Sequence, residues 1–133
     1  MTRYMLDTNI CIAVMKKQPD VRNRIETINP AFVGISGIVL AELTYGVYKS
    51  AQYTRNAQAL EDFCSMCQVW DWPVGAADTY GVIRTSLEQQ GRTIGANDLL
   101  IAAHATYLHA TLVTNNIREF ERISDLHIQD WTS

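Results

Sequence analysis

The sequence predicts an α/β fold in which helices cover both faces of a short parallel sheet, forming an α/β/α sandwich. Short apolar segments alternate with segments of helical periodicity, and strands that alternate with helices typically pair in parallel. No repeat, low-complexity tract or linker interrupts the 133 residues, so we expect a single domain over residues 1–133. A chain of this length with 47% hydrophobic residues can bury a core without disulfides or a structural metal.

The first part of the chain contains two strand–turn–helix units. Residues 4–6 form a short apolar strand, after which Thr8 or Asn9 caps a helix. Residues 31–35 form a second strand, and Ser36 caps the helix that follows. The apolar face of that helix carries Val39, Leu43 and Val47.

The rest of the chain continues the alternation of helices and strands. Helical periodicity covers residues 52–67, 74–90, 97–108 and 117–122. Apolar strand patterns cover residues 69–72, 111–114 and 127–129. Gly91 follows the second of these helices, in the position of a C-terminal stop. Ligands of such open sheets bind beyond the carboxyl ends of the strands, which is where functional residues are expected.

Composition narrows the functional classes. The 11 basic and 14 acidic side chains give a formal net charge of −3, which argues against broad electrostatic wrapping of nucleic acid and leaves only local contacts. Three cysteines without a companion cluster favour a reducing compartment over a secreted disulfide framework. No apolar run approaches the ~18 residues of a membrane span, so we expect a cytoplasmic protein with no membrane partner.

Three acids stand in apolar surroundings. Asp7 follows the first strand, Glu42 lies in the helix after the second strand, and Asp98 lies near the start of the helix at 97–108. An acid among apolar neighbours is costly unless its charge is compensated, and Mg²⁺ or Mn²⁺ with its oxygen ligands would compensate it. Each acid alone also fits a simpler role as a helix cap, a salt-bridge partner or an exposed side chain, and Asp98 as a helix-dipole acid.

Four motifs together resemble the PIN-domain ribonucleases, and more closely the VapC toxins of type II toxin-antitoxin systems. The resemblance extends from about residue 4 to Trp131. The motifs are MLDTN at 5–9, AEL at 41–43 with Gly46, GRTIGAND at 91–98 with IAAHA at 101–105, and LVTNN at 112–116 with Glu119 and Phe120. Each motif is weak alone, whereas all four in this order and at this spacing are specific.

The resemblance implies a PIN-domain fold and a Mg²⁺-dependent endoribonuclease, in which Mn²⁺ can substitute. Asp7, Glu42 and Asp98 match the acidic positions that bind metal and act in catalysis. The family's fourth position is often an acid, whereas this chain has Thr114, Asn115 and Asn116 there. We expect Asn116 to act as the fourth catalytic residue by binding metal-bound water, with Glu119 as the alternative. The number of metal ions is left open.

Other polar residues are candidates for contacts with RNA or with the acids. Thr8, Asn9 and Thr114 can position water or the scissile phosphate, although capping explains Thr8 and Asn9 almost as well. Arg92 is a candidate phosphate contact, as are Arg118, Arg122, Lys16 and Lys17, with surface solvation as the alternative for each. We expect Trp70, Trp72 and Trp131 to pack, the Cys64 and Cys67 thiols to pack, and His104, His109 and His127 to be structural.

The functional expectation is a toxin that hydrolyses structured RNA and thereby inhibits translation. The resemblance implies a tRNA substrate, with the initiator tRNA anticodon stem-loop as the specific choice. It also implies a homodimer and a cognate VapB-type antitoxin in a hetero-oligomer, which reaches operator DNA only through the antitoxin. In-line hydrolysis would leave 5′-phosphate and 3′-hydroxyl ends. The alternative is a catalytically weak PIN-fold module that binds RNA or protein, which the amides at 115–116 allow.

Overall fold

A five-stranded parallel sheet forms the centre of the computed structural model, which describes residues 1–132. The strands are β1 (Tyr4–Leu6), β2 (Val33–Ser36), β3 (Gln68–Trp70), β4 (Thr111–Val113) and β5 (His127–Gln129), in the order β3-β2-β1-β4-β5. All four pairings are parallel, and Tyr4 at the start of β1 lies opposite Val33 of β2 and Thr111 of β4. The predicted α/β fold class is confirmed, with β1 as the central strand.

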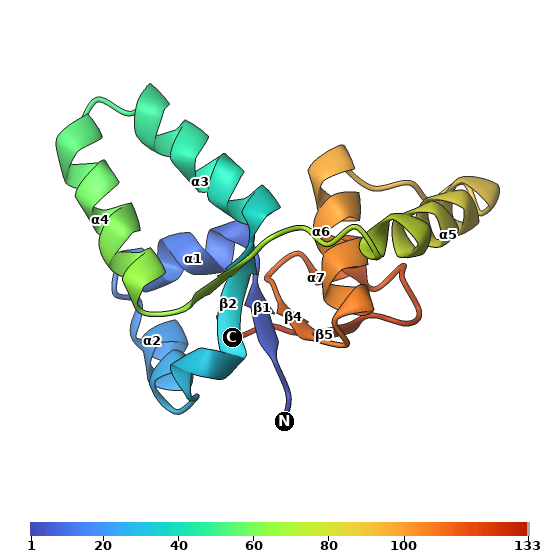
Figure 1. Cartoon of the computed structure of the whole chain (residues 1–133), viewed down its shortest axis with the longest axis horizontal. Coiled ribbons are helices and arrows are strands. Elements are labelled where there is room, and N and C mark those ends of the chain that lie inside the picture. The colour runs from blue at the N-terminus through green and yellow to red at the C-terminus, as the bar shows by residue number, and fades with distance from the viewer. Residues whose placement is uncertain (133) are drawn as a thin grey trace.

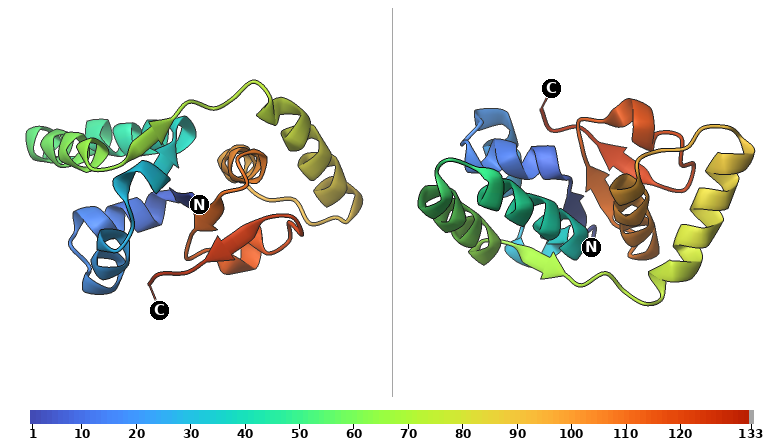
Figure 2. Two further views of the ribbon diagram at one scale, coloured as in Figure 1. Left: turned by 60° about the horizontal axis from the view of Figure 1, so that its bottom comes forward. Right: turned by 90° about the horizontal axis from the view of Figure 1, so that it is seen from above.

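Seven helices connect these strands within the described residues. They are α1 (Thr8–Met15), α2 (Pro19–Glu26), α3 (Gly37–Lys49), α4 (Tyr53–Ser65), α5 (Ala76–Gln89), α6 (Ala96–Tyr107) and α7 (Ile117–Phe120). Figure 1 shows the α3–α4 pair at one end of the molecule and α5 at the other. Both views in Figure 2 place α6 between them, and α6 packs against α3 as well as α5.

The helix ends show how local sequence sets the elements. Ser36 caps α3 as predicted, because its Oγ accepts a hydrogen bond from the Ile38 backbone N–H at 3.1 Å. Gly91 has φ +64 after α5, the left-handed conformation of a C-terminal stop. The prediction of Thr8 or Asn9 as the cap of α1 is wrong. Asp7 is the cap, since its backbone is extended and its side chain accepts from the Thr8 N–H.

Three differences from the predictions have a clear physical reason. Helix α2 was not predicted, because Val21 and Ile25 are its only apolar residues besides Pro19 and are too few to show a helical period. Residues 30–32 form a 3₁₀ turn instead of the start of β2, since Pro30 fixes the turn and Asn29 caps it. Strand β3 ends at Trp70 instead of residue 72, and the Trp72 indole N–H donates to the Leu100 carbonyl at 2.8 Å.

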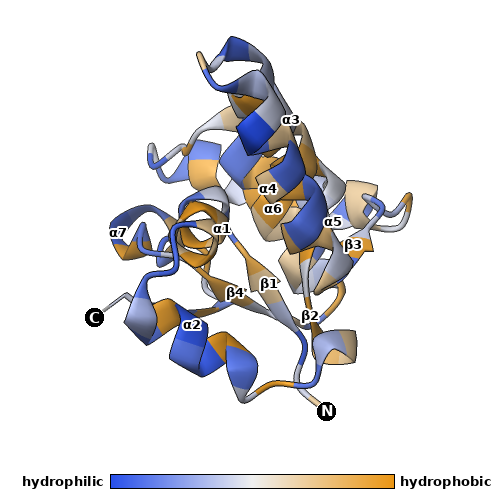
Figure 3. Cartoon of the chain, turned by 90° about the vertical axis from the view of Figure 1, so that its left-hand side faces the viewer, coloured by the Kyte–Doolittle hydropathy of each residue, from blue (hydrophilic) through white to orange (hydrophobic). Residues whose placement is uncertain are grey.

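The core lies between the sheet and helices α1, α3 and α6. Figure 3 shows β1 and β4 in hydrophobic colours, whereas α2 carries many hydrophilic residues. Residues 101–105 of α6 are all buried, which matches a helix covered on more than one side. Trp131 is buried beside Tyr4, with ring centroids 5.5 Å apart, and Trp70 and Trp72 pack against the same core as expected.

The cysteines are free thiols that pack into this core. Cys11 is fully buried, and Cys64 and Cys67 are partly buried. Burial raises the pKa of the Cys67 thiol to about 12, which leaves it protonated and unreactive at neutral pH. Among residues 1–132, no helix is both long and apolar enough to cross a membrane.

Gly34 provides a test of the β2–β3 pairing. A Cβ at this position would lie 2.5 Å from the Gln68 carbonyl oxygen, and that oxygen belongs to the paired strand and cannot rotate away. We expect Gly34→Ala to lower the free energy of unfolding by about 1–3 kcal/mol through overpacking. Chemical denaturation monitored by circular dichroism measures the change.

The matched control is Gly81→Ala in the exposed part of α5. A Cβ at Gly81 meets nothing within 4 Å. Alanine there should stabilise the protein by about 0.5–1 kcal/mol, because glycine is a poor residue inside a helix. Equal effects of the two substitutions would contradict a close approach at Gly34.

Candidate active site

Four carboxylates from four elements converge near the carboxyl end of the central strands. Asp7 directly follows β1, Glu42 lies on α3, Asp98 lies in the first turn of α6, and Glu119 lies on α7. Their charges act on one another: the negative charges of Glu42 and Glu119 contribute to a raised pKa of Asp7. The topology thus brings together side chains that are up to 112 positions apart in the sequence.

Asp7 is the most enclosed of the four acids. It is 7% exposed, and each of its oxygens accepts a hydrogen bond, Oδ1 from the Thr8 N–H at 2.9 Å and Oδ2 from the Thr114 hydroxyl at 2.8 Å. Its backbone N–H continues the β1–β4 pairing by donating to the Val113 carbonyl. Burial raises the pKa of Asp7, and the two hydrogen bonds only partly offset this effect.

Thr8 links Asp7 to Glu42. Its backbone N–H donates to Asp7, while its hydroxyl donates to Glu42 Oε1 at 3.0 Å. Because Thr8 begins α1 and Glu42 lies in α3, this one residue fixes two acids from separate elements next to each other. The predicted role of Thr8 as a residue beside the acids therefore has a defined geometry.

Two hydrogen bonds hold the carboxylate of Glu119, the alternative to Asn116 as the fourth residue of the site. Its Oε1 accepts the Gly95 N–H at 2.9 Å, and its Oε2 accepts the Asn116 amide at 2.6 Å. Partial burial acts to raise the pKa of Glu119, but the hydrogen bonds from Gly95, Asn116 and Asp98 and the charge of Arg122 together lower it. The Asn116 side chain thus orients the fourth carboxylate.

Asp98 has a pKa well above that of an ordinary aspartate. Burial, a hydrogen bond to Glu119 and the negative charges of Glu119, Asp7 and Glu42 raise the pKa of Asp98 to about 7. Near neutral pH about half of the Asp98 side chains are therefore protonated, and the protonated form can donate to Glu119. A pKa raised by burial and by neighbouring acids marks a site where negative charge has accumulated.

A buried hydrogen bond joins the helices that carry Glu42 and Asp98. His104 Nδ1 of α6 lies 2.9 Å from the Ser36 hydroxyl, and Ser36 is the N-cap of α3. Burial lowers the pKa of His104 to about 4, so the ring is neutral at physiological pH. The structural role predicted for His104 fits this contact, whereas the side chains of His109 and His127 are exposed.

The donors fit a hard divalent cation. The four acids offer only oxygen atoms, which Mg²⁺ and Mn²⁺ prefer. Among residues 1–132 the ion pairs join Arg22 to Glu26 and Arg84 to Glu88, and neither pair includes an acid of this cluster.

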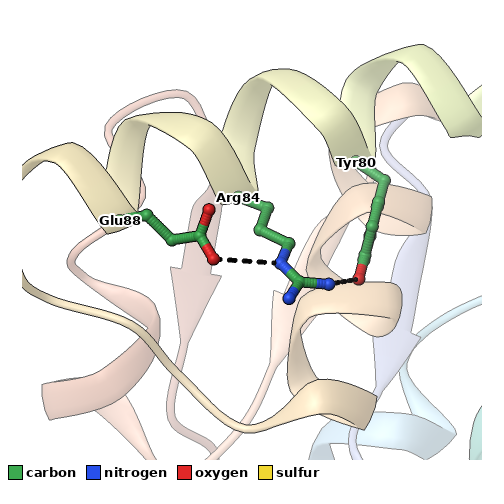
Figure 4. Close-up of polar contacts among 3 residues, drawn as sticks. All are labelled: Tyr80, Arg84 and Glu88. Carbon is green, nitrogen blue, oxygen red and sulfur yellow. Dashed lines mark hydrogen bonds and ion pairs between the residues drawn. The ribbon is translucent and has the colours of Figure 1, made fainter.

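Figure 4 shows Arg84 on α5 held between Glu88 and the Tyr80 hydroxyl.

The side chains of the four acids do not form a ligand set for a metal ion in this structure. Within residues 1–132, no group of three or more His, Cys, Asp or Glu side chains is close enough to hold an ion as the side chains stand. The acids therefore fit a metal by their chemistry and by their uncompensated charge, and binding would require their side chains to turn toward a common point.

A cavity of about 700 Å³ adjoins the acids between α1, α3 and α4. Thr8 and Glu42 line its end at the acid cluster. Apolar and cationic side chains also line it, among them Ile12, Met15 and Leu60, with Lys16, Lys17 and Arg55. The cavity therefore brings one acid of the cluster and three cations into the same lining.

The other predicted site residues lie in different places. Thr114 is fully buried and supports Asp7, whereas Asn9 is exposed on α1. Arg92 lines a separate cavity between α5 and residues 121–125, and none of the four acids lines that cavity. Arg122 donates to the Thr93 carbonyl and its charge reaches Glu119.

Comparisons with known proteins give consistent matches along the chain. The family model of the PIN domain matches residues 4–126. Ribonuclease VapC2 of Rickettsia felis is 48% identical over 130 residues, covering 96% of this chain and 97% of the relative. The tRNA(fMet)-specific endonuclease VapC of Shigella flexneri is 44% identical over 133 residues, covering 99% of this chain and 100% of the relative.

A solved structure is similar over the same extent. The crystal structure of VapBC2 from Rickettsia felis, bound to a DNA fragment from their promoter, matches with a TM-score of 0.92 and 47% sequence identity. The match covers 98% of this chain and 99% of that chain. Sequence and structure therefore agree on the same group of relatives.

The raised pKa of Asp98 predicts how stability depends on pH in the absence of metal. The pKa of Asp98 is about 7 in the folded state and about 3.8 for an ordinary aspartate, so the folded protein binds this proton more tightly than the unfolded chain. Protonation of Asp98 therefore stabilises the folded state, and the effect is complete only below pH ~4. This contribution is lost as the pH rises toward 7. We expect Asp98→Asn to raise the melting temperature at pH 8 in EDTA, and to raise it less at pH 5.

The matched control is Asp78→Asn, in the first turn of the exposed helix α5. This substitution should show no comparable gain at pH 8. Circular dichroism melting curves at the two pH values measure both variants. A melting temperature of Asp98→Asn at or below that of the unaltered protein at pH 8 would contradict the proposed accumulation of charge.

Proposed function

This chain belongs to the PIN domain family as a VapC-type ribonuclease, and we propose that it is a divalent-metal-dependent endoribonuclease that cuts tRNA. The observation that carries this proposal is the convergence of Asp7, Glu42, Asp98 and Glu119, none of which forms an ion pair within residues 1–132. Four oxygen ligands with excess negative charge suit an ion that also binds a phosphodiester.

Asp7, Glu42 and Asp98 are the proposed metal ligands, and Glu119 is the fourth acid of the site. When bound, Mg²⁺ or Mn²⁺ would supply a Lewis acid for the phosphate and a water of lowered pKa. The chain's own residues prepare the site: Thr8 and Thr114 orient Asp7, and Asn116 orients Glu119. Such outer contacts fix ligand orientation.

Proton transfer falls to the same carboxylates. We assign acceptance of the proton of the attacking water to an oxygen of Glu42 or Asp98. Above pH ~7 Asp98 is mainly ionised, and its negative charge is then available to a cation. In-line attack on phosphorus would leave a 5′-phosphate and a 3′-hydroxyl.

The proposed substrate is initiator tRNA, cut in its anticodon stem-loop. A relative that is 44% identical over 99% of this chain is named a tRNA(fMet)-specific endonuclease. Cutting that tRNA would inhibit translation in the cytoplasm, which fits the proposed role as a toxin.

The proposed partner is a VapB-type antitoxin in a hetero-oligomer with a toxin homodimer. A similar solved structure is a VapBC2 complex on a promoter DNA fragment, and we assign the DNA contact to the antitoxin. We place a segment of the antitoxin in the cavity between α1, α3 and α4, with a cationic side chain against the acids. That contact would block RNA and replace the metal.

The alternative of a catalytically weak binding module has less support. It depended on amides at 115 and 116, where the family often has an acid. The Glu119 carboxylate lies beside Asp98 and supplies the charge that those amides do not. The alternative therefore loses the observation that motivated it.

Removing a ligand or the metal should abolish cleavage. We expect Asp7→Asn to lower the rate of tRNA cleavage by more than the 10–100-fold typical of residues that only support a ligand, so by at least ~100-fold. Asp20→Asn, on the exposed first turn of α2, is the control and should cleave normally. Gel analysis of total tRNA with Mg²⁺, and with excess EDTA, measures both effects.

The product ends test the reaction chemistry. Hydrolysis by metal-activated water leaves 5′-phosphate ends, which a 5′-phosphate-dependent exonuclease degrades. Products with 2′,3′-cyclic phosphate, or full activity in EDTA, would contradict the proposed mechanism.

Thr114→Val tests the support of Asp7. Valine has a similar shape but cannot donate to Asp7 Oδ2, so we expect cleavage to fall ~10–100-fold and the Mg²⁺ concentration for half-maximal activity to rise. Thr111→Val is the matched control, since Thr111 is also buried, at the start of β4, and its side chain forms no hydrogen bond to the acids within residues 1–132. Equal activity of the two variants would show that the Thr114 hydroxyl is dispensable.

A further inference from the structure

An exposed stripe on α3 leads away from the acid cluster. Tyr45 and Lys49 follow Glu42 at spacings of three and seven residues, which places the three side chains along one face of the helix. With a helical rise of 1.5 Å per residue, Tyr45 lies about 4.5 Å and Lys49 about 10.5 Å farther along the axis than Glu42. The stripe therefore begins at the proposed active site.

Tyr45 and Lys49 form a solvent-facing pair. The Tyr45 side chain is 66% exposed, and the Lys49 ammonium lies 5.1 Å from the centre of its ring. One exposed aromatic residue on a surface is ordinary. An aromatic ring with a cation over one face, one helical turn from Glu42, has the chemistry that binds a nucleobase and its phosphate.

Positive charge also lies on the other side of Glu42. Lys16, Lys17 and Arg55 line the cavity between α1, α3 and α4, and Glu42 lines the same cavity. Tyr45 and Lys49 are not part of that lining. The acids are therefore flanked by cations in two directions, which suits a polyanion that passes across the site.

We propose that Tyr45 and Lys49 form the subsite for an unpaired nucleotide of the RNA next to the cleaved phosphodiester. The free face of the Tyr45 ring stacks on the base, and the Lys49 ammonium contacts a neighbouring phosphate. Proteins recognise RNA loops in this way, by stacking unpaired bases on aromatic side chains. The subsite rests on the proposed function, since it assumes that RNA is the substrate. It would give the ribonuclease a preference for unpaired bases at the cut.

Tyr48 provides a matched control on the same helix. It is 69% exposed, which is nearly equal to Tyr45, but it is six residues from Glu42 and lies about 120° from it around the helix axis. Its ring packs instead on Tyr53 of α4, with centroids 5.2 Å apart. A general effect of removing an exposed tyrosine should appear equally at both positions.

The main experiment measures cleavage of an RNA stem-loop with unpaired loop bases. We expect Tyr45→Ala to raise KM about 5- to 150-fold, the range that follows from the loss of one stacked base, with a smaller change in kcat. Tyr45→Phe should stay within about twofold of the unaltered enzyme because the ring remains. Tyr48→Ala should leave both constants unchanged, and melting curves should show that all variants are folded.

A binding experiment reads the stacking directly. In an Asp7→Asn background, which is expected not to cut, a loop carrying 2-aminopurine should lose fluorescence on binding when Tyr45 or Phe is present, and should keep it with Ala. Lys49→Ala should weaken binding and reduce its dependence on salt concentration, since one phosphate contact is lost.

The outcomes separate this subsite from the proposed function. Cleavage by the unaltered enzyme with no difference between Tyr45→Ala and Tyr48→Ala would overturn the subsite alone. So would a Tyr45→Phe enzyme as poor as Tyr45→Ala, or a Tyr45→Ala variant that loses only antitoxin binding, which would assign the stripe to a protein interface. An unaltered protein that cuts no RNA would overturn both proposals.

Discussion

The buried carboxylate of Asp7 is the constraint around which this molecule is arranged. A charge that is almost removed from water is unfavourable unless donors surround it. Here one donor comes from the start of α1 and the other from Thr114 at the end of β4. Because Thr114 is itself enclosed and receives the Asn116 N–H, the position of the acid depends on the pairing of β1 with β4 and on the turn that follows. The centre of the sheet and the reactive edge are thus one structural unit.

The remaining acids are held close against their mutual repulsion. Helix α6 is buried along residues 101–105, and His104 ties it to the cap of α3 through Ser36. These contacts fix the two helices while the first turn of α6 presents Asp98 and the middle of α3 presents Glu42. Two helices fixed in this way can hold a destabilising cluster of like charges in place. Active sites commonly lower the stability of the folded state in this manner.

Local sequence pattern could predict most of the frame and only part of the site. The strands and the helices α3 and α6 are rich in apolar residues, and Asp7, Glu42 and Asp98 stand out as acids among apolar neighbours. Helix α2 has too few apolar residues to be recognised in this way. Glu119 could not be distinguished from Asn116, because its orientation depends on a hydrogen bond from Gly95, 24 residues away, within a four-residue helix. A contact between distant segments leaves no local signal.

The long sequence separation within the site affects how the protein is made. The hydrogen bond from Thr114 to Asp7 spans 107 residues, and Glu119 comes later still. A chain emerging from the ribosome lacks β4, one of the two strands that pair with its central strand, and two of the groups around Asp7, until nearly all of it has been synthesised. The ribonuclease site would therefore stay incomplete on the ribosome that is producing it. The order of the elements along the chain delays activity to the last stage of synthesis.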